Sequence, residues 1–135
     1  MARELRVLVC GGRDFSDGMK MHFALQDLWD ERGPFAVIIH GNARGADAEA
    51  KEWALEKGIK HAPFIAAWED LTAPGAVIRY IKATGKPYNA NAGPQRNQRM
   101  IDDGKPDIVV AFPGGKGTRD MIDRARRAGL EVIEV

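Results

Sequence analysis

The chain has 135 residues, with 20 Lys and Arg against 19 Asp and Glu, 44% hydrophobic residues and one cysteine. A domain usually takes about 100 to 200 residues, so this length predicts one domain, residues 1–135, with a core that needs no disulfide or metal. The net charge of +1 argues against the broad basic surface of a nucleic-acid-binding protein, and Cys10 has no partner for a disulfide.

Five short apolar runs have the length and β-branched content of buried strands. They are Leu5 to Cys10, Phe35 to His40, Ile59 to Phe64, Asp107 to Phe112 and Leu130 to Val135. The central runs are almost entirely apolar, so we expect both faces of their sheet to be covered.

The connections between these strands have the pattern of helices with one apolar face. Residues 21–28, 46–54 and 121–125 place apolar side chains at helical spacing, and Gly58 and Gly129 suit the left-handed conformation that ends a helix. Alternating strands and helices build a parallel sheet with right-handed crossovers. We therefore predict a Rossmann-like three-layer α/β/α domain with a parallel sheet of five strands in the order 3-2-1-4-5.

Residues 65–91 break this alternation. The stretch contains two prolines and two glycines around a short predicted helix, Ala76 to Ala83. We expect an irregular insertion that lies outside the sheet as a flap or long connection.

Three predicted strands end in glycine-rich turns that lead into a helix: GGRDF at 11–15, GNARGAD at 41–47 and PGGKGT at 113–118. Because parallel strands end at the same edge, the three turns should share one crevice, with the first and third facing each other at the point where strand order reverses. Glycine lets the backbone approach a ligand closely, and the positive end of the next helix attracts phosphate or carboxylate. The alternative is that these glycines only permit tight turns.

Charged side chains lie in or near these turns. An arginine fork at Arg13, Arg44 or Arg96 can hold a phosphate, and Asp14 or Asp47 can accept ribose hydroxyls. Alternatively, the two aspartates cap helices and Arg44 is a solvated loop charge. The predicted ligand-binding set is Gly11, Gly12, Arg13, Asp14, Phe15, Gly41, Arg44, Gly45, Asp47, Arg96, Asn97, Pro113, Gly114, Gly115, Gly117 and Thr118.

Aromatic side chains are candidates for a wall on which a base could stack. Phe15, in the first turn, and Trp68 or Tyr88, in the irregular stretch, are placed to close over a ligand. Trp29 and Trp53 fall on helix faces and are expected in the core.

Several chemistries are disfavoured. The chain lacks the GxxxxGK[ST] and GxGxxG motifs of ordinary nucleotide hydrolysis and hydride transfer, and Ser16 is its only serine. The three histidines lack metal-ligand spacing, so we expect no metal site and no required cofactor. No apolar run resembles a signal peptide or membrane span, so we expect a cytoplasmic protein with no membrane partner.

The motifs GGRDF, HGNARGAD, AGPQRNQRM and AFPGGKGT, in this order, resemble the YspA or cpYpsA-related family of the SLOG superfamily, which also includes the LOG phosphoribohydrolases and DprA. The resemblance spans nearly the whole chain. It implies a Rossmann-like domain that binds a nucleotide or nucleotide-derived ligand at the glycine turns, and a homodimer.

The LOG pattern PGGxGTxxE maps onto residues 113–121 with one important difference. Met121 stands where the catalytic glutamate is usual, while Arg96 corresponds to the LOG arginine and Asn97 stands where a lysine is usual. A thioether neither stabilises an oxocarbenium ion nor activates water. The resemblance therefore favours binding over catalysis.

Three hypotheses follow. The first is a sensor or sequestering domain for a nucleotide-derived phosphate ligand, either an ADP-ribose or NAD-like molecule or a nucleoside monophosphate. The second is a LOG-like phosphoribohydrolase that cleaves a nucleotide N-glycosidic bond, with Arg96, Asp14 and Asp47 as candidate catalytic residues. The third is DprA-like binding of single-stranded DNA, which needs an electropositive groove; at a net charge of +1, nucleic acid is not an expected partner.

Overall fold

The computed structural model describes residues 4–135. Along the chain the elements are β1 (Leu5–Cys10), α1 (Gly18–Arg32), β2 (Phe35–His40), α2 (Ala46–Lys57), β3 (His61–Pro63), β4 (Ile78–Tyr80), β5 (Pro87–Asn89), α3 (Ala92–Asp102), β6 (Ile108–Ala111), α4 (Lys116–Arg127) and β7 (Glu131–Glu134). No helix within this described part is both long and apolar enough to cross a membrane.

Five strands form one parallel sheet in the order β3-β2-β1-β6-β7. The predicted fold class and strand order are confirmed, because β6 and β7 are the fourth and fifth strands of the prediction. Val7 of β1 lies opposite Ile38 of β2 on one side and Ile108 of β6 on the other. β1 is therefore central, and the strand order reverses between β1 and β6.

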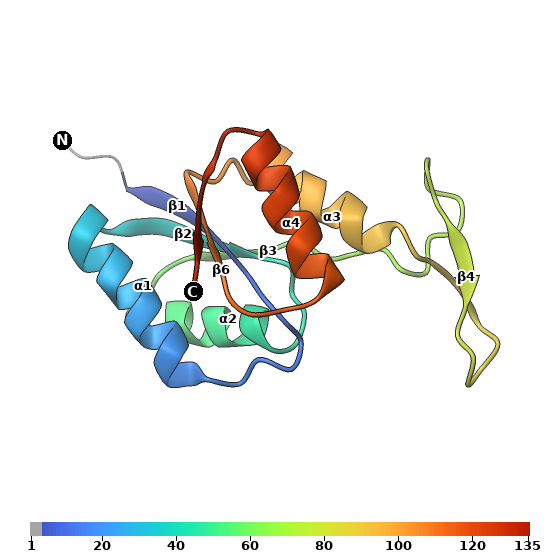
Figure 1. Ribbon diagram of the computed structural model, residues 1–135, viewed down its shortest axis with the longest axis horizontal. Helices are drawn as coiled ribbons and strands as arrows, with labels where there is room; N and C mark the ends of the chain where they lie inside the picture. Colours follow the sequence, from blue (N-terminus) through green and yellow to red (C-terminus); the bar gives the residue numbers. More distant parts are fainter. Residues whose placement is uncertain (1–3) are drawn as a thin grey trace.

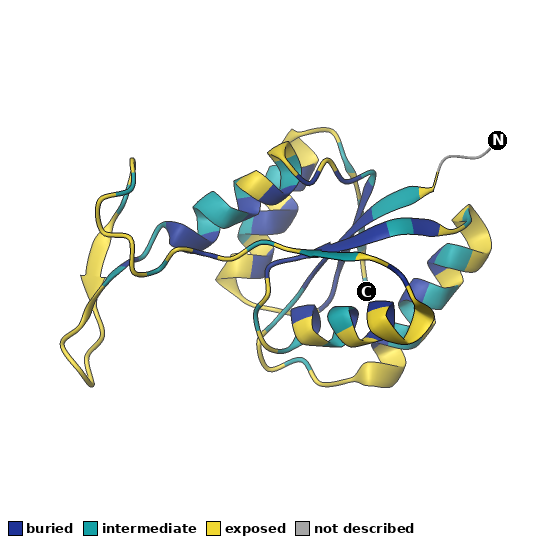
Figure 2. Ribbon diagram, turned by 180° about the vertical axis from the view of Figure 1, so that it is seen from behind, coloured by how far each residue is buried: buried dark blue, intermediate teal, exposed yellow. Residues whose placement is uncertain are grey.

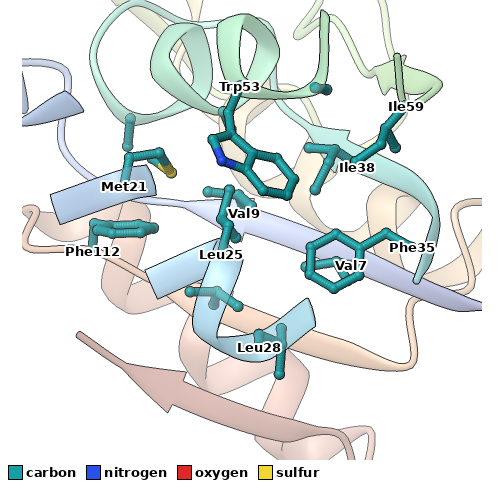
Figure 3. Close-up of a cluster of buried hydrophobic side chains, with 14 of the residues drawn as sticks. Val7, Val9, Met21, Leu25, Leu28, Phe35, Ile38, Trp53, Ile59 and Phe112 are labelled. Carbon is teal, nitrogen blue, oxygen red and sulfur yellow. The ribbon is translucent and has the colours of Figure 1, made fainter. Parts of the chain in front are cut away.

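Two pairs of helices cover the two faces of the sheet. Figure 1 shows α1 and α2 on one face and α3 and α4 on the other. Under α1 and α2, alternate residues of β1 such as Val7 and Val9 pack with Leu25 and Trp53, as Figure 3 shows. The opposite alternation, which includes Leu8, packs beneath α3 and α4. This matches the apolar character of strands buried on both faces.

Local chemistry explains where the helices begin and end. α1 begins after Asp17, whose carboxylate accepts a hydrogen bond from the Lys20 N–H at 3.0 Å. α2 ends at Gly58 with φ of +69°, and Gly129 follows α4 with φ of +79°. Both glycines adopt the left-handed conformation predicted for them.

The predicted helix from Ala76 to Ala83 is wrong. Residues of β4 pair antiparallel with β5, and the chain reverses at Gly85, whose φ is +70° and whose N–H donates to the Ile81 carbonyl at 2.7 Å. The run VIRYI is rich in β-branched and aromatic residues, which suit a strand. We call residues 76–91 the arm. It projects from the molecule beyond α3 (Figure 1), and its surface is mostly exposed (Figure 2).

A polar network holds the base of the arm. The side-chain oxygen of Asn89, which is fully buried, accepts hydrogen bonds from the N–H groups of Val77 at 3.1 Å and Asn91 at 3.0 Å. Its amide nitrogen donates to Gln95 of α3 at 3.3 Å, and its backbone N–H donates to the Trp68 carbonyl at 2.7 Å. The arm is thus fastened to α3 and to the segment that carries Trp68.

Candidate functional site

The three glycine turns meet at one edge of the sheet and bond directly to one another. The Gly12 N–H donates to the Pro113 carbonyl at 2.8 Å, and the Gly12 carbonyl accepts from the Ala46 N–H at 3.1 Å. The first turn is therefore joined both to the PGGKGT turn and to the start of α2. This is the edge at which open α/β sheets bind ligands, next to the reversal of strand order.

The glycines of these turns fall into two groups: some are packed too tightly to allow a side chain, and others border open space. Gly45 has φ of +79°, and a Cβ there would collide with the Gly12 carbonyl; a Cβ on Gly114 would collide with the Thr118 hydroxyl. At these positions the turns pack too tightly for a side chain. A Cβ on Gly115 or Gly117 would meet nothing within 4 Å, so these two glycines border open space.

A cavity of about 640 Å³ lies at this edge. Its size is typical of sites for small molecules. Nine residues of the predicted ligand-binding set line it: Gly11, Gly12, Arg13, Asp47, Arg96, Asn97, Gly115, Gly117 and Thr118.

The N-terminus of α4 points positive partial charge into this cavity. α4 starts at Lys116, its N-cap residue Gly115 makes no side-chain capping bond, and its first turn has no acidic residue. The first N–H groups of a helix have no partner within it, and the helix dipole adds positive potential there. Lys116 itself lines the cavity, so this end of it is suited to an anion.

Arg96 of α3 lies on the wall of the cavity. Its Nη1 donates to the Gly41 carbonyl at 2.6 Å and its Nε donates to the Asn97 side-chain oxygen at 3.2 Å. Burial lowers the pKa of the guanidinium, while the nearby Asp47 carboxylate opposes that shift. A Cβ on Gly41 would come within 2.7 Å of Nη1, so glycine at this position lets Arg96 reach the second turn.

Asp47 is a buried carboxyl in the first turn of α2. It is 8% exposed and accepts a hydrogen bond from the Ala43 N–H at 3.2 Å. Burial raises its pKa to about 6, although that bond and the Arg96 and Arg13 charges favour ionisation. The carboxyl therefore both stabilises the second turn and faces the cavity.

Asp14 and Arg44 lie on the surface. Asp14 has a fully exposed side chain, 3.9 Å from an Arg44 guanidinium nitrogen that is itself in a side chain 77% exposed. Asp17, not Asp14, caps α1, so a capping role for Asp14 is wrong. Arg44 lines a second cavity of about 470 Å³, which shares Arg13, Ala43, Trp68 and Arg96 with the first.

Of the three aromatic residues predicted to form a stacking wall, only Trp68 lines the larger cavity. The Phe15 ring packs against Phe112 with centroids 5.0 Å apart and joins the core, so it is not a cavity wall. Trp68 lines both cavities, and the Arg13 guanidinium lies 5.8 Å from its ring centroid. Tyr88 lies in β5 of the arm, away from both linings.

Asn97 positions the PGGKGT turn. Its amide nitrogen donates to the Gly117 carbonyl at 3.2 Å and to the Asp120 carboxylate at 3.0 Å, and Asp120 also pairs with Arg124 at 2.8 Å. Met121, only 1% exposed, completes the wall where the LOG pattern has glutamate. Asp120 is thus held by two partners.

The predicted set omitted one cation that lines the larger cavity and included residues that do not line it. Lys116 lines the larger cavity and was identifiable from its position inside PGGKGT. Pro113 and Gly114 line a separate cavity of about 200 Å³, and Gly45 is enclosed by the first turn. Cys10 also borders the larger cavity, where burial raises its thiol pKa to about 12 and so disfavours the reactive thiolate.

Together, the parallel sheet and the glycine turns at its reversal point define a Rossmann-like α/β domain with a crevice suited to anions. The chain belongs to the YspA, cpYpsA-related SLOG family, whose profile matches residues 5–70. It is 34% identical over 131 residues to the Gene 61 protein of Mycobacterium phage D29, an alignment that covers 95% of this chain and 94% of the phage protein.

The fold is also similar to a solved structure. The X-ray structure of DNA processing protein A (DprA) from Streptococcus pneumoniae matches with a TM-score of 0.67 and 22% identity over 97% of this chain. The chain spans half the length of that DprA chain. At this identity the likeness shows the α/β fold alone.

Proposed function

We infer that the larger cavity binds a nucleotide-derived phosphate ligand, either an ADP-ribose or NAD-like molecule or a nucleoside monophosphate, and that the protein acts as a sensor or sequestering domain. The observation that carries this proposal is the open N-terminus of α4 in a cavity of about 640 Å³ that Lys116 also lines. Oxygens of a phosphate there would accept hydrogen bonds from backbone N–H groups of the PGGKGT turn.

Other residues that line the cavity suit the rest of such a ligand. Trp68 offers an indole face for a base, and Asp47 offers a carboxyl for ribose hydroxyls. Arg13 and Arg96 line the same cavity and add positive charge to it. The proposal thus accounts for the cavity's polar and aromatic lining with one ligand class.

Isothermal titration calorimetry with AMP, ADP-ribose, NAD and inorganic phosphate tests this function. We expect at least one nucleotide to bind, and we expect Lys116→Gln to weaken it by roughly tenfold, as for a lost charge-assisted contact. Lys20→Gln, which removes an exposed lysine of α1, is the matched control and should bind as the wild type does. Absence of binding by every compound would contradict the proposal.

A second candidate is hydrolysis of a nucleotide N-glycosidic bond, and one observation favours it. The Asp47 carboxyl lines the cavity with its pKa raised to about 6, which suits a general acid near neutral pH. Met121 in place of glutamate weighs against the LOG mechanism, so Asp47 would have to act instead. Chromatography of nucleoside monophosphates incubated with the protein should then show free base, and Asp47→Asn should abolish it. Unchanged nucleotides would exclude this activity.

A further inference from the structure

The charge of the chain is unevenly distributed, although its sum is close to zero. Between Leu71 and Ile101 there are five Lys and Arg and no Asp or Glu, which leaves 15 Lys and Arg against 19 Asp and Glu in the rest of the chain. This basic stretch comprises the arm and most of α3. Although the net charge of the chain is only +1, residues 71–101 therefore form a basic region of the kind that binds polyanions.

Three of these cations lie on the arm and are free to contact a partner. Arg79, Lys82 and Lys86 are exposed, and within residues 4–135 none of them forms a salt bridge. The other two basic residues have partners inside the domain, because Arg96 donates to Gly41 and Arg99 donates to the Ile65 carbonyl at 2.7 Å. Within this basic stretch, the cations without a partner inside the domain are therefore those of the arm.

Two tyrosines, Tyr80 and Tyr88, lie close in sequence to these cations. In the antiparallel pair of β4 and β5, Arg79 lies directly opposite Tyr88. These two side chains therefore share one face of the pair, whereas Ile78 and Tyr80 share the other. Tyr80 is 67% exposed. Exposed rings on which unpaired bases stack and cations that contact phosphates are the usual elements of single-strand recognition.

We propose that the arm binds single-stranded nucleic acid, with Arg79, Lys82 and Lys86 contacting phosphates and Tyr80 stacking on a base. The surface is separate from the proposed nucleotide site, since none of these four residues lines the larger cavity. Pairing of two arms in a dimer is disfavoured because it would bring together two surfaces that each carry three cations and no anion.

Fluorescence anisotropy with a labelled oligothymidylate of about 20 nucleotides tests the proposal, at roughly 50 mM and roughly 200 mM salt. The arm variant combines Arg79→Gln, Lys82→Gln and Lys86→Gln. We expect it to bind at least about tenfold more weakly at low salt, and its plot of log affinity against log salt to be shallower by about 2, since each lost phosphate contact removes about 0.7. A control with Lys20→Gln, Lys60→Gln and Arg127→Gln has the same net charge and should match the wild type.

Four further measurements separate this proposal from its alternatives. Tyr80→Ala should weaken oligothymidylate binding by roughly fivefold or more, and a duplex of equal length should bind less tightly than the single strand. Lys116→Gln in the cavity should leave the oligonucleotide affinity unchanged. Sedimentation of the wild type and the arm variant should give the same oligomeric state.

Several results would overturn the proposal. These are no oligonucleotide binding at low salt, equal losses in the arm and control variants, a duplex that binds as tightly as the single strand with no effect of Tyr80→Ala, or loss only in Lys116→Gln. An arm variant that changes oligomeric state but not oligonucleotide affinity would instead make the arm a self-association surface.

Discussion

At the scale of single residues, the glycines of the turns separate structural from ligand-facing roles. Gly45 combines a positive φ with contact to the Gly12 carbonyl, whereas Gly117 lies in the first turn of α4 and borders the cavity. The alternative that these glycines only permit tight turns therefore holds for Gly45 and does not account for Gly117.

We predict opposite effects of alanine at these two glycines. Gly45→Ala should lower the free energy of unfolding by roughly 2 kcal/mol or more, because it adds strain at a positive φ and a steric clash. Gly117→Ala should leave stability unchanged or raise it by roughly 0.5 kcal/mol, since alanine favours a helix more than glycine does. Urea denaturation followed by circular dichroism measures both. Equal losses in the two variants would show that open space at Gly117 is needed for folding.

At the scale of secondary-structure elements, the start of α1 distinguishes two aspartates of similar sequence context. Asp17 accepts a hydrogen bond from the Lys20 N–H, while Asp14 has a fully exposed side chain three residues earlier. We expect Asp17→Ala to cost roughly 1 kcal/mol of unfolding free energy, as for loss of an N-cap, and Asp14→Ala to cost nothing measurable. Thermal denaturation of the two variants checks this, and a larger loss in Asp14→Ala would mean that the capping residue is misassigned.

The attachment of the arm to the domain depends on the hydrogen bonds of Asn89, because the two strands of the arm are short. Two strands of three residues are marginal alone, so the buried Asn89 network with Val77, Asn91 and Gln95 supplies the attachment. We predict that Asn89→Ala increases amide hydrogen exchange across residues 76–91 while β1 and β6 stay protected. Thr84→Ala, at the exposed tip, is the control and should leave exchange at the base unchanged. Protection of the arm in both variants would contradict this account.

At the scale of the whole molecule, the order of the strands in the sheet could be predicted from the sequence, whereas the structure of the arm could not. The bounds of β1 and β2 agree with the predicted strands to the residue, because their apolar runs are flanked by Glu4, Pro34 or glycine. The run VIRYI at 77–81 is too short for its periodicity to decide between helix and strand, and the Asn89 contacts that hold it come from ten or more residues away.

The same limit applies to the candidate site. The glycine turns could be placed at one edge from strand direction alone. Whether Phe15 turns toward Phe112 or toward the cavity depends on the packing of β6, which lies almost a hundred residues away. Local patterns thus predict which segments meet, and tertiary packing decides which side chains face a ligand.

Two buried titratable groups have opposite effects on stability across the whole molecule. The Asp47 pKa rises to about 6 mainly through burial, so this group lowers stability as pH rises from about 4 to about 6. The His40 pKa falls to about 4 through burial and its proximity to His61 and Lys51, so this group raises stability as pH rises from about 4 to about 6.5. His40 Nδ1 accepts from the Asn42 N–H at 3.0 Å and its Nε2 lies 3.0 Å from His61 Nδ1, which fits a neutral ring.

These two contributions oppose each other in the wild type, and single substitutions should expose each of them. Relative to the wild type, Asp47→Asn should gain roughly 2 to 3 kcal/mol of unfolding free energy between pH 4 and pH 6.5, because it lacks the penalty of ionising a buried carboxyl. His40→Gln should lose a similar amount over the same interval, because protonation no longer destabilises it at the acidic end. Urea denaturation at half-unit pH steps measures both differences. Parallel profiles for the wild type and both variants would show that neither group has a shifted pKa in the folded protein.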